Sequence, residues 1–155
     1  MTLLAIGDQA PEITARRRDG SELTLSSLRG RQVLVYFYPK DDTPGCTIQG
    51  KAFTATKAEF EKRQIHVAGI SADDVASHKD FCNKFSLTVE LLADPDAALL
   101  KALGVPQSDY KGTLYWNRTT FVVDPTGVLR KVYPSVNPQG HEEVLLKDIT
   151  ALQAA

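Results

Sequence analysis

The run Gln32–Tyr38 (QVLVYFY) constrains the fold of this chain most, because it consists almost wholly of β-branched, aliphatic and aromatic residues. Gly30 stands two residues before the run and Pro39 directly after it, so the run is typical of a strand that is buried on both faces of a sheet. Residues 39–45 then have the composition of a loop. After Cys46, apolar residues recur at helical spacing, and we expect a helix that runs to about Arg63. The sequence thus places one cysteine where a core strand passes into the N-terminus of a helix.

The position of Cys46 favours a reactive thiolate. The first turn of a helix has backbone N–H groups without intrahelical partners and a partial positive charge, and both stabilise an anion. Helix N-termini and nearby cations lower the pKa of a cysteine from about 8.5 to between roughly 3.5 and 7.5. Asp41 and Asp42 would oppose this effect if they faced the sulfur, so we expect them to point to solvent and a fixed cation to lie near Cys46. An inert, buried cysteine is the alternative that the spacing leaves open.

The remaining elements follow from turn signals and hydrophobic periodicity. We expect a short N-terminal hairpin (11–14 and 22–25), a helical turn (26–30), a second buried strand (64–71), a helix capped by Asp73 or Asp74 with Val75, His78, Phe81, Cys82 and Phe85 on one side, a short strand (91–93), a short helix (96–103), a late hairpin (119–123 and 128–133) and a closing amphipathic helix (141–152).

These elements predict an α/β fold. The early strand–helix–strand segment implies two parallel strands with a crossover helix, and the late hairpin implies antiparallel strands. The pattern resembles the thioredoxin-like arrangement, a central mixed β-sheet flanked by helices, here with an N-terminal hairpin extension. At 155 residues, the chain is expected to form a single domain over residues 1–155.

Charge and composition make several classes of protein unexpected. The formal net charge of −1 gives no reason to expect nucleic acid or an anionic membrane as partner, and a solvated hairpin arm explains the run Arg16–Arg18. No apolar run resembles a signal peptide or a membrane span, so we expect a cytoplasmic protein.

Two cysteines do not form a structural disulfide framework. His78 and Cys82 share a helix face as a possible metal half-site, but no second half has suitable spacing. We therefore expect no metal or other cofactor, and expect all three histidines at the surface or its boundary.

The segment Pro39–Thr47 (PKDDTPGCT) resembles the active-site loop of peroxiredoxins, in which a proline, a threonine or serine and a cysteine stand at fixed spacing. Its longer form, YPKDDTPGCT, is similar to the Q-type or bacterioferritin-comigratory subfamily. The likeness extends from Gly7–Pro11 (GDQAP) to the closing helix and includes residues 117–121 (NRTTF), similar to the family's arginine-bearing strand entry. It implies a thiol-dependent peroxidase that reduces hydrogen peroxide and organic hydroperoxides. The absence of a Cys-x-x-Cys dithiol around Cys46 fits a chemistry based on one nucleophilic sulfur.

The resemblance makes Cys46 the peroxidatic nucleophile, which becomes a sulfenic acid when it attacks the peroxide. It implies that Thr43 hydrogen-bonds the peroxide and the sulfur, that Pro39 shields the thiolate from water, and that Arg118 is the fixed cation. On the sequence alone, Arg118 is better explained as a solvated arginine at the start of a strand. The resemblance reverses that interpretation.

Cys82 is implied to be the resolving cysteine. Many relatives carry that residue five positions after the nucleophile, where this chain has Lys51, but a placement in the next helix also occurs in the subfamily. Periodicity alone favours a residue that merely fills the apolar face of its helix. Because a disulfide needs Cα atoms within about 7 Å, we expect the first turns of the Cys46 helix, and the Cys82 helix, to unwind before the bond forms. Thioredoxin or a similar dithiol donor would then reduce the disulfide.

Two other functions stay open at this point. A redox-switched interaction protein would use the same oxidation and unwinding to expose a binding surface. A one-cysteine peroxidase would be resolved by an external thiol. The chain has no obvious assembly segment, so we expect a monomer.

Overall fold

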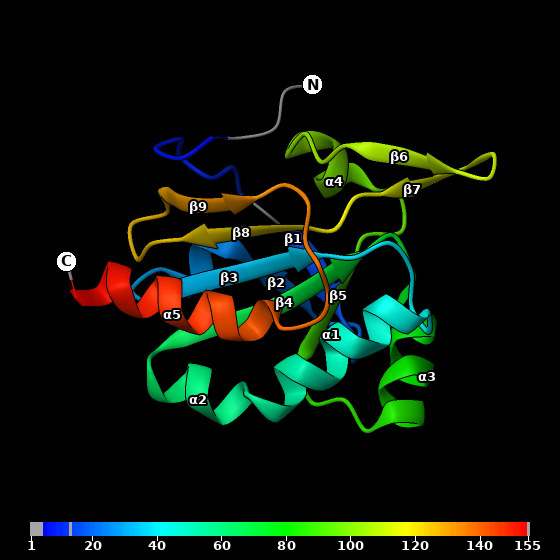
Figure 1. The fold of residues 1–155 in the computed structure, drawn as a ribbon, viewed down its shortest axis with the longest axis horizontal. Helices are drawn as coiled ribbons and strands as arrows, with labels where there is room; N and C mark the ends of the chain where they lie inside the picture. The colour runs from blue at the N-terminus through cyan, green and yellow to red at the C-terminus, as the bar shows by residue number, and fades with distance from the viewer. Residues whose placement is uncertain (1–4, 13, 155) are drawn as a thin grey trace.

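The computed structural model describes residues 5–12 and 14–154, and its centre is one β-sheet (Figure 1). In chain order its strands are β1 (Thr14–Arg17), β2 (Glu22–Thr24), β3 (Gln32–Phe37), β4 (Ile65–Ser71), β5 (Glu90–Ala93), β8 (Thr119–Val123) and β9 (Leu129–Tyr133). In space they lie in the order β2-β1-β5-β4-β3-β8-β9. β3, β4 and β5 run parallel to one another, whereas the strands outside them pair antiparallel. The predicted mixed sheet with an N-terminal hairpin is confirmed.

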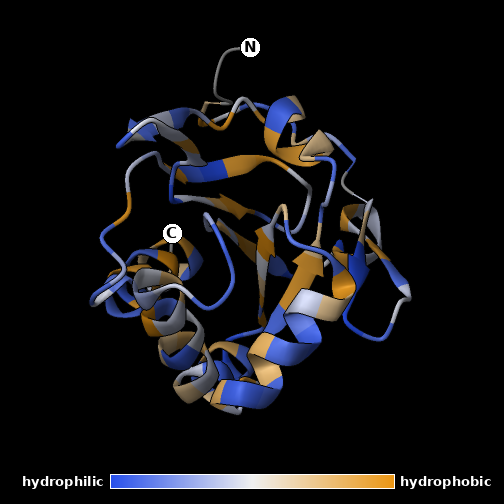
Figure 2. Ribbon diagram, turned by 90° about the vertical axis from the view of Figure 1, so that its right-hand side faces the viewer, coloured by the Kyte–Doolittle hydropathy of each residue, from blue (hydrophilic) through white to orange (hydrophobic). Residues whose placement is uncertain are grey.

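Helices cover the sheet. They are α1 (Pro44–Ala55), α2 (Lys57–Lys62), α3 (Val75–Phe85), α4 (Ala98–Ala102) and α5 (His141–Ala154), with a 3-10 turn at Leu25–Leu28. Side chains from α1, α2, α3 and α5 share one hydrophobic cluster, and Figure 1 shows these helices along the same side of the sheet. Figure 2 shows hydrophobic residues on the central strands and a mixture of hydrophilic and hydrophobic residues along the helices. None of the described helices is long and apolar enough to span a membrane.

β3 is buried on both faces, as its composition predicts. Val33, Val35 and Phe37 pack into one hydrophobic cluster, whereas Leu34 and Tyr36 pack into the cluster on the opposite face. Each of these side chains is at most 4% exposed. A strand that is held from both sides gives a rigid starting point to the loop that follows it.

The expected helix after Cys46 is interrupted, and a second hairpin is present that the sequence did not predict. Thr56 separates α1 from α2, because its backbone, with φ −99° and ψ 3°, departs from the α-helical range. β6 (Gln107–Tyr110) and β7 (Thr113–Trp116) form the additional hairpin at the upper right of Figure 1. Its strands are largely exposed, so they lack the alternation by which a half-buried strand is recognised.

The N-terminal hairpin joins the main sheet through β5 and is not a solvated arm. Ile13, inside the first expected strand, lies outside the described residues. Arg17 pairs with Glu90 at 3.2 Å, and Arg18 donates a hydrogen bond to the carbonyl of Leu87 at 3.1 Å. The expectation that the arginine run is merely solvated was therefore wrong for Arg17 and Arg18.

The expectation that all histidines lie at the surface or its boundary was wrong for two of them. His78 is completely buried and His141 is 7% exposed, whereas His66 is half-buried. Hydrogen bonds offset the cost of burying an imidazole. His141 Nε2 lies 2.9 Å from Thr120 Oγ1, and the partners of His78 are described below.

Burial of His141 predicts a pH dependence of stability. Burial lowers the pKa of His141 to about 4, against the opposing effect of Asp148, whereas in the unfolded chain a histidine titrates near 6.5. The unfolded state therefore binds the proton more tightly, and the stability that neutral His141 contributes above pH 6.5 is lost as the pH falls through about 4. We expect His141→Gln, whose side chain can still form a hydrogen bond with Thr120, to lose less unfolding free energy between pH 7 and pH 4 than the wild type. Urea denaturation measures this, and equal losses in both proteins would contradict it.

Candidate active site

Cys46 lies in the first turn of α1, which begins at Pro44. Proline suits this position, because its missing N–H would have no intrahelical partner there. Thr43 precedes the helix with an extended backbone, and its carbonyl accepts the N–H of Thr47 at 2.9 Å. The side chain of Cys46 is buried, with the residue 2% exposed. The sulfur is thus placed beside the N–H groups of a helix N-terminus, as the sequence predicted.

Strand pairing brings Arg118 to Cys46 from far along the chain. β8 runs antiparallel to β3 with Thr119 opposite Phe37, so Arg118 lies beside the end of β3 from which the loop to Cys46 departs. Arg118 Nη1 donates to Cys46 Sγ at 3.3 Å and to Gln49 Oε1 at 2.9 Å. The structure thus places a guanidinium group in direct contact with the sulfur.

Gln49 is a residue of the site that sequence reasoning missed. It lies one helical turn after Cys46 and is 1% exposed. Its side-chain carbonyl accepts from Arg118, while its Nε2 has no hydrogen-bond partner among the described residues. The sequence could have indicated Gln49 through its position three residues after Cys46, because residues i and i+3 lie on the same face of a helix.

Gly45 has no side chain, and the guanidinium group of Arg118 occupies the space where a side chain would lie. A Cβ at this position would lie 2.5 Å from Arg118 Nη2 and 3.1 Å from its Cζ. Any larger residue directly before Cys46 would therefore displace the guanidinium.

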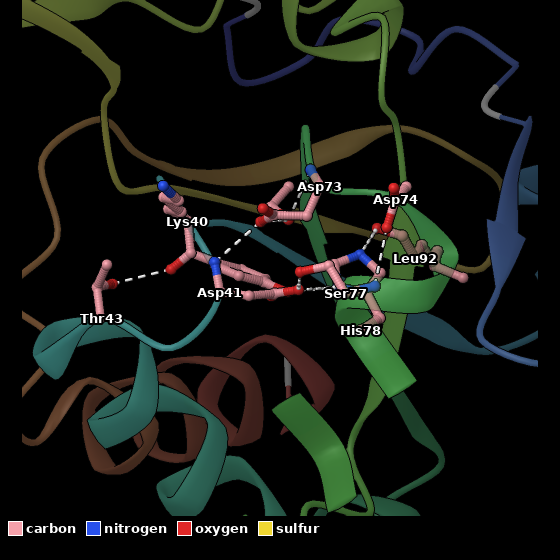
Figure 3. A network of polar contacts seen from close by, with 10 residues as sticks. Lys40, Asp41, Thr43, Asp73, Asp74, Ser77, His78 and Leu92 are labelled. Atoms are coloured by element: carbon pink, nitrogen blue, oxygen red, sulfur yellow. Dashed lines mark hydrogen bonds and ion pairs between the residues drawn. The ribbon is translucent and has the colours of Figure 1, made fainter. Parts of the chain in front are cut away.

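Thr43 and Pro39 lie in the loop between β3 and α1. The Thr43 hydroxyl group donates to the carbonyl of Lys40 at 2.8 Å, which closes the loop on itself (Figure 3). The structure brings Arg118 into contact with Cys46 Sγ, but it directs the Thr43 hydroxyl hydrogen to the loop backbone. The lone pairs of the Thr43 oxygen can still accept a hydrogen bond from another group. Pro39 is half-buried where the loop leaves β3.

The two aspartates of this loop differ, and the expectation that both point to solvent was wrong for Asp41. Asp42 is exposed and pairs with Lys84 at 2.8 Å. Asp41 is 7% exposed, and its carboxylate accepts from Tyr38 Oη at 2.6 Å and Ser77 Oγ at 2.7 Å. Donors supplied by the loop's own strand and by α3 offset the burial of the charge, and Figure 3 shows Asp41 directed at α3.

Cys82 lies in α3 and is also buried, 4% exposed, in the hydrophobic cluster that contains Cys46. Both cysteines are free thiols in this state. Burial raises the pKa of Cys82, although the Arg18 guanidinium opposes the effect. Burial raises the pKa of Tyr36, and negative charge on the sulfur of Cys46 or Cys82 would raise it further. The two sulfurs therefore lie within electrostatic range of the same phenol.

His78 has no ring nitrogen available for a metal. Its Nδ1 lies 2.7 Å from Asp41 Oδ2, and its Nε2 lies 3.0 Å from the carbonyl oxygen of Leu92. Among residues 5–12 and 14–154, no group of three or more His, Cys, Asp or Glu side chains is arranged to hold a metal ion.

The fold and this geometry can be compared with known proteins. The model of the AhpC/TSA family matches residues 6–132. The chain belongs to this family of peroxiredoxins. The peroxiredoxin is 41% identical over 152 residues to the putative peroxiredoxin bcp of Helicobacter pylori (strain ATCC 700392 / 26695), which covers 96% of this chain and 100% of that protein.

Solved structures of the same family share the fold of this peroxiredoxin. The PrxQ of Xylella fastidiosa, in a cysteine-to-serine variant, superposes with a TM-score of 0.93 at 30% identity and 99% coverage of both chains. A Xanthomonas campestris bacterioferritin comigratory protein, studied for its alkyl peroxide reduction activity, superposes with a TM-score of 0.84 at 32% identity and 90% coverage of both chains. The predicted thioredoxin-like fold and the resemblance to the Q-type subfamily are confirmed.

Proposed function

We propose that this peroxiredoxin reduces hydrogen peroxide and organic hydroperoxides with Cys46 as the peroxidatic nucleophile. The observation that carries the proposal is the contact between Arg118 Nη1 and Cys46 Sγ, 3.3 Å, in the first turn of α1. A guanidinium and a helix N-terminus together favour a thiolate over a thiol. The alternative of an inert core cysteine does not explain why a cation is directed at the sulfur.

In the first step, the Cys46 thiolate attacks one oxygen of the peroxide and the O–O bond breaks. The sulfur gains an oxygen and becomes a sulfenic acid, and the other oxygen leaves with the electron pair and takes a proton as water or an alcohol. Negative charge moves from sulfur to the leaving oxygen during this step. Arg118, fixed by Gln49, is positioned to stabilise that charge throughout.

Thr43 and Pro39 have supporting roles in this proposal. The Thr43 oxygen accepts a hydrogen bond from the incoming peroxide and helps to align the O–O bond with the sulfur. Pro39 shields the thiolate side of the pocket from water. The short hydrogen bond from the Thr43 hydroxyl group to Lys40 keeps the threonine in place before the substrate arrives.

In the second step, Cys82 attacks the sulfenic sulfur, forming the Cys46–Cys82 disulfide and releasing water. Support comes from the peroxiredoxin Q of Xanthomonas campestris, solved as two cysteine-to-serine variants whose replaced cysteines are separated by as many positions as Cys46 and Cys82. Both sulfurs are buried within folded helices, so the start of α1 and part of α3 unwind before the bond forms.

In the third step, a dithiol donor such as thioredoxin reduces the disulfide and is itself oxidised to a disulfide. The exposure created by unwinding gives the donor access to the bond. We further propose that the protein acts as a monomer in the cytoplasm, where reducing conditions keep both thiols available between turnovers.

The test is the fate of peroxide-treated protein. With thioredoxin, thioredoxin reductase and NADPH present, we expect many equivalents of peroxide to be consumed per chain, whereas a redox-switched interaction protein consumes about one. Non-reducing peptide mass spectrometry should find a Cys46–Cys82 peptide that has lost two hydrogens. A stable sulfenic acid or a mixed disulfide with an added thiol would instead establish the one-cysteine mechanism.

A further inference from the structure

The loop that carries Thr43 is fastened to the helix that carries Cys82 by a buried polar pair. Asp41 lies in the loop between β3 and α1, and His78 lies in the second turn of α3. His78 Nδ1 is 2.7 Å from Asp41 Oδ2, and both residues are buried. Figure 3 shows the loop and α3 on opposite sides of this contact. No step of the proposed mechanism uses either side chain.

The hydrogen bonds around the pair are complete. Each nitrogen of His78 faces an acceptor, Asp41 on the loop and the Leu92 carbonyl on β5. Tyr38 Oη also lies 3.3 Å from His78 Nδ1, so this phenol contacts both members of the pair. Asp41 also accepts from Tyr38 and Ser77, at 2.6 and 2.7 Å. Separating the loop from α3 would leave a buried polar group without its hydrogen-bond partner. The pair therefore strongly favours the closed arrangement, in which the loop packs against α3.

Further hydrogen bonds join the loop to the residues that lead into α3 and fix the start of that helix. The N–H of Asp41 donates to Asp73 Oδ2 at 2.9 Å, directly before α3 begins. Asp74 then caps α3 by accepting the N–H of Ser77 at 2.8 Å. Asp42 has a φ of +58°, a left-handed conformation that is uncommon for residues other than glycine and that persists only where the surroundings hold it. The loop therefore takes its shape partly from α3.

We propose that Asp41 and His78 are positioning residues that hold the peroxidatic loop on the resolving helix, so that the Cys46 and Cys82 segments are closed together and released together. This inference rests on the proposed function for its catalytic meaning. While the pair is intact, Cys46 stays beside Arg118 and can react with peroxide. Once it separates, both helices lose a shared attachment, and Cys82 can reach the sulfenic sulfur and displace its hydroxyl as water.

The first experiment is hydrogen exchange on the reduced full-length protein without peroxide, which makes it independent of the chemistry. We expect Asp41→Asn to accelerate exchange about tenfold or more in both residues 39–50 and residues 75–85, because one substitution breaks the shared attachment. Exchange in α5 should not change. Asp42→Asn is the matched control: asparagine tolerates the left-handed backbone, and only an exposed ion pair with Lys84 is lost, so exchange should stay at the wild-type rate.

His78→Gln tests the pair from the other side. Alone it should accelerate exchange in the same two segments, and in combination with Asp41→Asn its effect should be much smaller than the product of the two single effects. If Asp41→Asn unfolds the chain, Tyr38→Phe, which removes one donor to Asp41, provides a milder variant with the same expected pattern. Acceleration in one segment only, acceleration over the whole chain, or an equal effect of Asp42→Asn would overturn the proposal.

The second experiment measures disulfide formation after one equivalent of peroxide, by acid quenching and mass spectrometry. Asp41→Asn should form the Cys46–Cys82 bond about tenfold faster from the sulfenic acid while reacting more slowly with peroxide. An unchanged rate of bond formation in a variant with faster exchange would overturn the catalytic role of the pair. If the wild type forms no such bond at all, the proposed function fails, and hydrogen exchange still decides whether the pair joins the two segments.

Discussion

Arg118→Ala is expected to lower the second-order rate constant for reaction with peroxide by about a hundredfold to a thousandfold, the usual cost of removing one preorganised charge-stabilising donor. Its guanidinium contacts Cys46 Sγ, and in the proposed mechanism it stabilises the charge that moves to the leaving oxygen. Stopped-flow kinetics of sulfenic acid formation, in a Cys82→Ser background to prevent resolution, measure this step alone. The chain should remain folded, because Arg118 is only partly buried and directly precedes β8.

Two further variants test whether position, and not charge alone, is responsible. Gly45→Ala leaves Arg118 in the chain but places a methyl group where the guanidinium lies, so its peroxide reaction should slow in the same direction. Arg16→Ala removes an exposed arginine of the N-terminal hairpin and should react at the wild-type rate. A wild-type rate constant in Arg118→Ala would refute the assigned role of this residue.

Replacing the two cysteines is expected to separate the two chemical steps. Cys46→Ser should abolish peroxide consumption, because a serine hydroxyl is a far weaker nucleophile that peroxide does not convert to a sulfenic acid analogue. Cys82→Ser should consume about one equivalent of peroxide per chain and then stall with thioredoxin as the only donor. A coupled assay with thioredoxin reductase measures both, and free sulfenic acid in the stalled variant can be trapped with a dimedone probe.

The cysteine variants also decide between resolution mechanisms. Sustained turnover of Cys82→Ser with thioredoxin would mean that the donor attacks the Cys46 sulfenic acid directly, and Cys82 would then be a core residue. Addition of a small thiol to Cys82→Ser should restore turnover, because an external thiol can take the place of the missing one. Circular dichroism of both variants provides the control for folding.

The parts of the fold that could be predicted from the sequence depend on local patterns. β3 was predicted because its residues are apolar on both faces, and the cap of α3 was narrowed to Asp73 or Asp74, of which the structure shows Asp74. The break at Thr56 is a local change in backbone dihedral angles, which hydrophobic periodicity does not reveal. The β6–β7 hairpin has too little buried surface to create a pattern.

The candidate site was predictable in its chemistry but not in its contacts. The position of Cys46 indicated that a cation was needed, and the resemblance to peroxiredoxins suggested Arg118. The register between β3 and β8, which brings them together, is a property of the folded sheet. The burial of Asp41 could not be foreseen either, because its partner His78 comes from a distant helix and the cost of burying a carboxylate depends on its donors.

The central claim is that Cys46, placed beside Arg118 at the start of α1, is the nucleophile that breaks the O–O bond. The most direct measurement is peptide mass spectrometry of the reduced Cys82→Ser variant after less than one equivalent of peroxide per chain, with the Cys46→Ser/Cys82→Ser double variant as the control. The account predicts that Cys82→Ser gains one oxygen at Cys46 and that the double variant leaves the peroxide unconsumed. Oxygen added at another residue, or equal peroxide consumption by the double variant, would contradict it.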